Sequence, residues 1–111
     1  MIQYPDNASL SELQRYVKEK CRERGFDKAE DLETYLLFSE EIGELAKAIR
    51  RFRGLFKEDG RTEAQVQAQA QIAEEMADVL SYLLELANRF GVDLDGAFRS
   101  KEAINDRRHW S

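Results

Sequence analysis

The sequence is poor in residues that interrupt helices or cross-link a chain. Its 111 residues include one proline, Pro5, one cysteine, Cys21, and one histidine. With so little proline, and with glycines where helices would stop, the pattern is that of helix, turn and helix throughout. A single cysteine excludes an intrachain disulfide, and a lone thiol among charged neighbours suits a reducing compartment, so we expect a cytoplasmic protein.

Long apolar runs are also missing. Residues 1–10 have neither the basic start nor the apolar run of a signal peptide, and no stretch approaches the roughly 20 apolar residues that span a bilayer, so we expect no membrane partner. The formal net charge of -5 argues against binding to a nucleic-acid polymer, because affinity for a phosphate backbone depends mainly on lysine and arginine. A small anionic ligand is compatible with this charge if a metal ion bridges the repulsion.

What the sequence has is the pattern of one small domain spanning residues 1–111. Charged residues make up 35% of the chain and alternate with leucine, isoleucine, valine and alanine, as in globular helical proteins. Hydrophobic periodicity predicts an all-α fold with four helices. We expect them at residues 9–24, 27–54, 72–90 and 93–108, with a helix-favouring but weakly anchored stretch at 64–71 and a mobile loop at 55–62.

Local signals mark the ends of these helices and their inward faces. Ser9 and Glu12 form a capping-box pattern at the first helix, Gly25 follows its end, and Asp93 is placed to cap the fourth helix. Apolar periodicity then predicts which residues face inward. They are Ile42, Leu45 and Ile49 in the second helix, Ile72, Met76, Val79, Leu80, Leu83, Leu86 and Phe90 in the third, and Leu94, Ala97, Phe98 and Ile104 in the fourth.

Two of the expected helices carry a pair of acids three residues apart. Glu41 and Glu44 lie on one side of the second helix, and Glu75 and Asp78 share a flank of the third, beside its apolar stripe. Mg²⁺ binds through a few carboxylates together with substrate phosphates, whereas four crowded acids without a cation would repel one another. No histidine accompanies either pair, which argues against zinc and against di-iron bundles. The sequence therefore predicts a magnesium site between two helices.

Three segments together resemble the MazG-type nucleotide pyrophosphohydrolases of the all-α NTP pyrophosphatase superfamily. They read Glu40-Glu41-Ile42-Gly43-Glu44, then Glu75-Met76-Ala77-Asp78 continued by Val79-Leu80-Ser81-Tyr82-Leu83-Leu84, and finally Lys101-Glu102-Ala103-Ile104-Asn105-Asp106-Arg107-Arg108. The last segment is similar to the closing Lys-x-x-x-Asn-x-x-Arg element of that family. The resemblance covers about residues 9–110.

The resemblance implies a Mg²⁺-dependent hydrolase, with Mn²⁺ as a substitute, that converts a nucleoside triphosphate (NTP or dNTP) into the monophosphate and pyrophosphate. Glu41, Glu44, Glu75 and Asp78 would be the metal ligands. Glu40 completes the first motif and would bind a further metal or position the attacking water. Cleaning of the nucleotide pool is the role that such an activity suggests.

Residues beyond the acids would hold the nucleotide. Lys101, Asn105 and Arg108 suit phosphate oxygens by charge and hydrogen bonding, with an ordinary charged helix end as the alternative. Tyr82 and Phe26 are the candidates for stacking on the base, since related deoxycytidine-triphosphate enzymes carry aromatics at the corresponding places; both are also compatible with a core role. Those relatives have a tryptophan after the first acid motif where this chain has Arg51-Phe52, so a strict deoxycytidine preference does not carry over.

The expected architecture is a four-helix bundle-like MazG fold completed by oligomerisation, as a homodimer or homotetramer, because four helices alone leave the acid flanks partly uncovered. One alternative function is that of phosphoribosyl-ATP pyrophosphohydrolase, a cousin in the same superfamily. Another is a non-catalytic helical interaction or regulatory protein whose acids only solubilise its surface, with Glu40 or Glu44 paired with Lys47.

Overall fold

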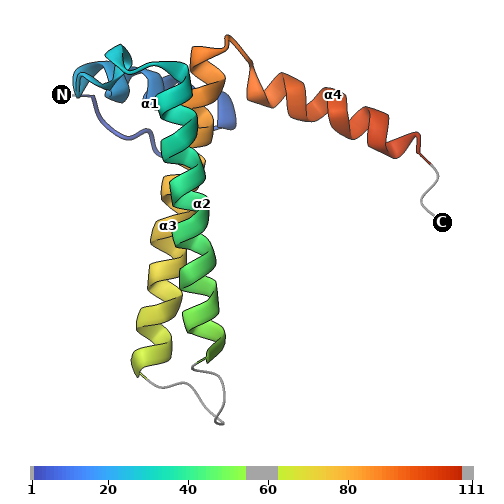
Figure 1. Cartoon of the computed structure of the whole chain (residues 1–111). Helices are drawn as coiled ribbons and strands as arrows, with labels where there is room; N and C mark the ends of the chain where they lie inside the picture. The colour runs from blue at the N-terminus through green and yellow to red at the C-terminus, as the bar shows by residue number, and fades with distance from the viewer. Residues whose placement is uncertain (1, 55–62, 109–111) are drawn as a thin grey trace. The chain divides into compact units, whose positions relative to one another are not determined.

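The computed structural model describes residues 2–54 and 63–108, and within these ranges every regular element is a helix. The all-α prediction is therefore confirmed. The elements are α1 (Leu10–Glu23), the short 3₁₀ helix η1 (Phe26–Lys28), α2 (Asp31–Gly54), α3 (Glu63–Arg89) and α4 (Leu94–Asp106), as Figure 1 shows. The expected loop at 55–62 lies outside the described residues. None of the described helices has the length and apolar character needed to cross a bilayer.

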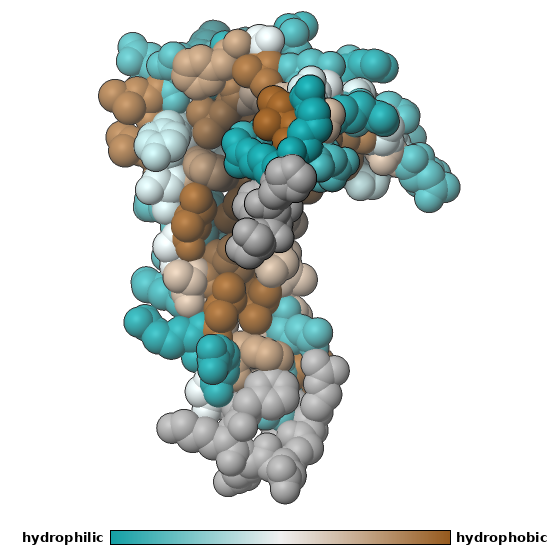
Figure 2. Space-filling model, turned by 90° about the vertical axis from the view of Figure 1, so that its right-hand side faces the viewer, coloured by the Kyte–Doolittle hydropathy of each residue, from teal (hydrophilic) through white to brown (hydrophobic). Residues whose placement is uncertain are grey.

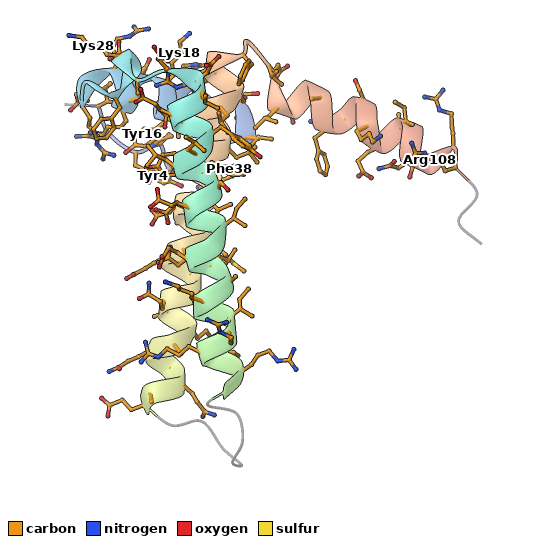
Figure 3. The ribbon with its side chains drawn as sticks, in the orientation of Figure 1. Tyr4, Tyr16, Lys18, Lys28, Phe38 and Arg108 are labelled. Carbon is orange, nitrogen blue, oxygen red and sulfur yellow. The ribbon has the colours of Figure 1, made fainter. Side chains whose placement is uncertain are left out.

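The first helix begins and ends as the sequence predicts. Ser9 Oγ accepts a hydrogen bond from the Glu12 amide at 3.1 Å, and Glu12 Oε1 accepts one from the Ser9 amide at 3.2 Å. This reciprocal capping box satisfies amides that have no partner within the helix. After the helix, Gly25 adopts a φ of 80°, a left-handed conformation that glycine takes without steric penalty. The preceding segment is tied to α1 by an edge-to-face contact of Tyr4 with Tyr16, whose ring centroids lie 5.4 Å apart (Figure 3).

The second helix begins later than predicted. The expected start at Asp27 is wrong, because Phe26–Lys28 forms a 3₁₀ turn and α2 begins only at Asp31. Arg89 holds this turn from a distant part of the sequence, donating hydrogen bonds to the backbone oxygens of Phe26, at 2.8 Å, and Ala29. A carbonyl engaged in this way is less available to a continuing helix, and no local sequence pattern reveals such a contact.

The fourth helix begins at the predicted place but with a different cap. Asp93 occupies the position before the helix, yet its side chain makes no capping hydrogen bond. Gln14 of α1 supplies the acceptor instead, since its Oε1 accepts from the Leu94 amide at 3.2 Å while its Nε2 donates to the Val92 oxygen at 2.6 Å. Asn88 in turn donates to the Gln14 backbone oxygen at 3.0 Å. These bonds join α1, the end of α3 and the start of α4.

The chain divides into two compact units. The first contains α1, η1, α4 and the end of α3 from Leu84, and the second contains α2 and α3 up to Leu83. In the first, the buried apolar side chains within residues 2–29 and 84–108 are Leu84 and Ala87. In the second, α2 and α3 run side by side in opposite directions (Figure 1).

The second unit buries small and polar side chains between its helices. Among the described residues of this unit, the buried ones are Thr34, Ala48, Gln65, Ala68 and Glu75. Two helices side by side bury only the strip along which they meet, and here that strip carries the acids and alanines. α3 also begins at Glu63, so the weakly anchored stretch at 64–71 is helical.

Most of the apolar residues expected to face inward lie at the surface of the chain. Met76 is 53% exposed and Phe98 is 65% exposed. The same correction applies to Ile42, Ile49, Leu80, Leu83, Phe90, Ala97 and Ile104, which are exposed. Only Leu45, Ile72, Val79, Leu86 and Leu94 are half-buried. Figure 2 shows hydrophobic side chains reaching the surface on the face that it presents. The amphipathic pattern is real, but its apolar stripe lies outside the strip that α2 and α3 share.

Candidate active site

Three of the predicted metal ligands meet between α2 and α3. Glu41 of α2 and Glu75 and Asp78 of α3 each offer a carboxylate oxygen, and these three oxygens lie within 4.8 Å of one another. Glu75 and Asp78 are one helical turn apart, so an uninterrupted helix holds them on one flank. This group of three is called the carboxylate cluster below.

Glu75 is the most buried member of the carboxylate cluster. The residue is only 9% exposed. Its Oε1 accepts a hydrogen bond from Gln71 Nε2 at 2.7 Å. Its other oxygen, Oε2, is buried and has no hydrogen-bond partner. A buried carboxylate oxygen is costly to leave without a partner. An oxygen-binding cation in the cluster would remove that cost.

Glu41 lies in an environment that disfavours its charged form. Burial raises the pKa of its carboxyl above the ordinary value of 4.5, and the negative charges of Asp78, Glu75 and Glu44 raise it further. Burial and the neighbouring carboxylates both make it unfavourable for Glu41 to carry a further negative charge in the cluster. A divalent cation would reverse them, because it favours the ionised form of each ligand.

The fourth predicted ligand, Glu44, is outside this group. Its Oε1 pairs with Lys47 Nζ at 3.6 Å, and both side chains are largely exposed. Glu40 is exposed as well. Of the two ion pairs considered for Lys47 from the sequence, the structure contains the one with Glu44.

The donor set suits a hard divalent cation. Carboxylate oxygens are the ligands preferred by Mg²⁺ and Mn²⁺, and the described part of the site contains no histidine or thiolate that would select a softer metal. The unpartnered Glu75 Oε2 adds a buried acceptor to this set. The residues present therefore fit such an ion.

The predicted nucleotide-binding residues fall in both units. Tyr82 lies on α3 one turn beyond Asp78, is half-buried, and belongs to the same unit as the carboxylate cluster. Phe26 belongs to the first unit, where η1 leaves it 56% exposed.

The phosphate-binding candidates belong to α4 and its end, in the first unit. Lys101 and Arg108 are exposed and Asn105 is half-buried, and Arg108 lies two residues beyond Asp106, the last residue of the helix (Figure 3). The four-residue spacing places Lys101 and Asn105 on one side of α4, and Arg108 follows beyond its end.

Sequence reasoning missed Gln71. The signal for it is its position four residues before Glu75, where two side chains on one helix are neighbours. The stretch around it is rich in glutamine and alanine, so no single glutamine stands out by composition. Only the 2.7 Å contact with Glu75 distinguishes it.

Comparison with known proteins places these residues in a family. Residues 29–110 match the MazG nucleotide pyrophosphohydrolase domain. The chain belongs to the MazG nucleotide pyrophosphohydrolases. The matched range contains α2, α3 and α4, and with them every candidate site residue except Phe26. The predicted family is thereby confirmed, and with it the class of enzyme, a nucleotide pyrophosphohydrolase.

Two known proteins are similar in sequence to this chain. The chain is 35% identical over 105 residues to dCTP pyrophosphatase 1 of Homo sapiens, an alignment that covers 91% of this chain and 59% of the human protein. It is 27% identical over 94 residues to the uncharacterized protein YvdC of Bacillus subtilis (strain 168), covering 84% of this chain and 89% of that protein. The chain thus spans less than two thirds of the human relative and most of the bacterial one.

Proposed function

We propose that this MazG domain hydrolyses a nucleoside triphosphate, NTP or dNTP, to the monophosphate and pyrophosphate in a Mg²⁺-dependent reaction. One water is consumed, the bond between the bridging oxygen and the α phosphorus breaks, and pyrophosphate leaves. The observation that carries the proposal is the carboxylate cluster with its buried, unpartnered Glu75 Oε2. A purely solubilising acidic surface has no reason to bury an acceptor in this way.

The cluster residues Glu41, Glu75 and Asp78 are the proposed metal ligands, and Glu44 joins them by leaving its exposed pair with Lys47. Mg²⁺, or Mn²⁺ in its place, supplies neutralisation of phosphate oxygens and a bound water of lowered pKa. Glu40, at the start of the same motif, is the proposed residue for orienting water or a further ion. Each of these side chains acts by offering an oxygen at a fixed place on a helix.

Residues of α4 and of the segment just after it are the proposed phosphate contacts. Lys101 and Arg108 provide positive charge, and Asn105 provides a neutral donor and acceptor between them. Tyr82 and the exposed Phe26 offer aromatic faces for the base, because stacking does not require a particular hydrogen-bond pattern.

The human relative suggests which nucleotide to try first. Its name is dCTP pyrophosphatase 1, and its alignment includes 91% of this chain, so dCTP heads the proposed substrates. Arg51 and Phe52 stand where the resemblance to deoxycytidine-triphosphate enzymes implies a tryptophan, so we propose activity on dCTP without strict preference. Removal of unwanted nucleotides from the cytoplasmic pool is the role that follows.

We propose a homodimer or homotetramer as the active form. The support is the row of exposed apolar side chains on the second unit, including Met76, Leu80 and Leu83. Contiguous apolar surface of this kind is characteristic of interfaces. Sedimentation equilibrium measures the assembly, and a monomer at all concentrations would contradict it.

The test is a panel of NTPs and dNTPs with Mg²⁺ in which pyrophosphate and orthophosphate are assayed separately. We expect pyrophosphate equal to the monophosphate formed, and loss of turnover in E41Q. Glu74, an exposed neighbour of Glu75 outside the cluster, gives the matched control, and E74Q should retain activity. Release of orthophosphate without pyrophosphate would contradict the proposed bond cleavage. Turnover of phosphoribosyl-ATP and of no NTP or dNTP would show that the enzyme is instead a phosphoribosyl-ATP pyrophosphohydrolase.

A further inference from the structure

The hydrogen bond between Gln71 and Glu75 assigns a role to a residue outside the acid motifs. We propose that Gln71 is a positioning residue, which anchors Glu75 Oε1 so that Oε2 stays available to a divalent cation in the carboxylate cluster. This inference rests on the proposed function, because it requires the cluster to bind metal.

The geometry divides the two oxygens of Glu75 between two tasks. Gln71 Nε2 lies 2.7 Å from Oε1, a short and strong bond for a charged acceptor. Oε2 is buried without a partner. Because one oxygen is held, rotation of the carboxylate is restricted, and less freedom is lost when the second oxygen binds an ion.

The chemistry of Gln71 suits this task. An amide donates a hydrogen bond but carries no net charge, so it orients Glu75 without forming an ion pair that a cation must break. Lys47 has the opposite relation to Glu44, since its positive charge competes for that carboxylate. Hydrogen-bonding partners behind metal-ligating carboxylates typically change metal affinity by about 10- to 100-fold when they are removed.

The spacing makes the anchor rigid. Gln71 and Glu75 are four residues apart in the continuous helix α3, a separation at which side chains meet on one face. Gln71 is half-buried beside the nine-tenths buried Glu75. Limited solvent access keeps water from replacing the amide as donor.

Mn²⁺ binding without nucleotide tests the proposal directly. Isothermal titration calorimetry compares the full wild-type chain with Q71M, which keeps the length of the side chain but lacks the donor. We expect Q71M to bind Mn²⁺ about 10-fold or more weakly. Q67M, at an exposed glutamine one turn earlier, should bind as the wild type does, and Q71A should repeat the loss seen in Q71M.

Activity adds a second readout. In Q71M the Mg²⁺ concentration for half-maximal turnover should rise by the same factor, while turnover at saturating Mg²⁺ should approach that of the wild type. A purely structural role for Gln71 would lower the melting temperature of the metal-free protein and leave the Mn²⁺ dissociation constant unchanged, and that result overturns the inference. Equal weakening by Q67M also overturns it.

E75Q separates this inference from the function on which it rests. If E75Q loses Mn²⁺ binding while Q71M retains it, Gln71 is not a positioning residue and the metal site stands. If E75Q itself binds Mn²⁺ as tightly as the wild type, the carboxylate cluster is not the metal site, and both proposals fall.

Discussion

Lys47 forms an ion pair with Glu44 on α2, with 3.6 Å between Nζ and Oε1, while both side chains remain mostly in solvent. Exposed pairs of this kind contribute about 0–1 kcal/mol to stability and weaken with salt. The Glu44 carboxylate can therefore be drawn from Lys47 to a nearby cation at little cost.

K47M should consequently be close to neutral for stability, changing the free energy of unfolding by less than about 0.5 kcal/mol. It should lower the Mg²⁺ concentration needed for half-maximal activity, because Glu44 no longer has a positive competitor. K28M, at an exposed lysine of η1, is the control and should leave that concentration unchanged. A higher Mg²⁺ requirement in K47M would mean that Lys47 assists the site.

Glu75 should show a conflict between stability and function. In the absence of metal, E75Q replaces a buried negative charge with an amide that still accepts from Gln71 and can donate to a neighbouring carboxylate. We expect urea denaturation in a chelator to give a free energy of unfolding about 1–3 kcal/mol higher than that of the wild type. Turnover with Mg²⁺ should fall by at least about 100-fold. Destabilisation of E75Q under these metal-free conditions would contradict the unpartnered state of Oε2.

The pKa of Glu41 predicts the direction of the pH dependence of stability. Its carboxyl has a pKa raised above 4.5 by burial and by its acidic neighbours, so the folded protein holds a proton that the unfolded chain has released. The contribution of Glu41 to stability is therefore present below the ordinary pKa and is lost as the pH rises through the folded pKa.

Metal-free unfolding from about pH 4.5 to about pH 7.5 measures this effect in wild type and in E41Q. The stability of the wild type relative to E41Q should fall as the pH rises. Saturating Mg²⁺ should reduce the fall, since the cation favours the ionised carboxylates. A relative stability that increases with pH would show that the environment of Glu41 favours its charge.

Arg89 should contribute strongly to the stability of the first unit. It pairs with Glu85 at 3.1 Å, with both side chains about 15% exposed, and also donates to the backbone oxygens of Phe26 and Ala29. R89M leaves a poorly solvated carboxylate and two carbonyls without their donor, so we expect a loss of about 2–4 kcal/mol in the free energy of unfolding.

The matched control for Arg89 is Arg99, whose pair with Asp95 has the same spacing of four residues but is exposed. R99M should change the free energy of unfolding by less than about 0.5 kcal/mol. Equal effects of R89M and R99M in chemical denaturation would show that burial of the Arg89 hydrogen bonds adds nothing to the free energy of unfolding.

Local signals predicted the parts of the fold that depend on neighbours in sequence. The capping box of Ser9 and Glu12 and the left-handed Gly25 are each determined within a few residues. The placement of Glu75 and Asp78 on one flank of α3 was also predictable, because a three-residue spacing keeps two acids on one side of a helix. The cluster itself required the family motifs to bring the two helices together.

Contacts between distant residues were not predictable. Arg89 bonds the turn that precedes α2, and Gln14, which lies 80 residues before Leu94, caps α4. Hydrophobic periodicity showed that Met76 and Ile42 share an apolar stripe with their neighbours, but it could not show which strip of each helix faces the other. Small and polar residues line the strip between α2 and α3, and Gln71 is one of the polar residues near the carboxylate cluster.

The central claim, that this MazG domain splits a nucleoside triphosphate between its α and β phosphorus atoms with the aid of the carboxylate cluster, is tested most directly by ³¹P nuclear magnetic resonance of dCTP turnover. With Mg²⁺, the wild type should produce deoxycytidine monophosphate and pyrophosphate in equal amounts, and E75Q should leave dCTP intact. Release of orthophosphate with deoxycytidine diphosphate, or undiminished turnover by E75Q, would contradict the account.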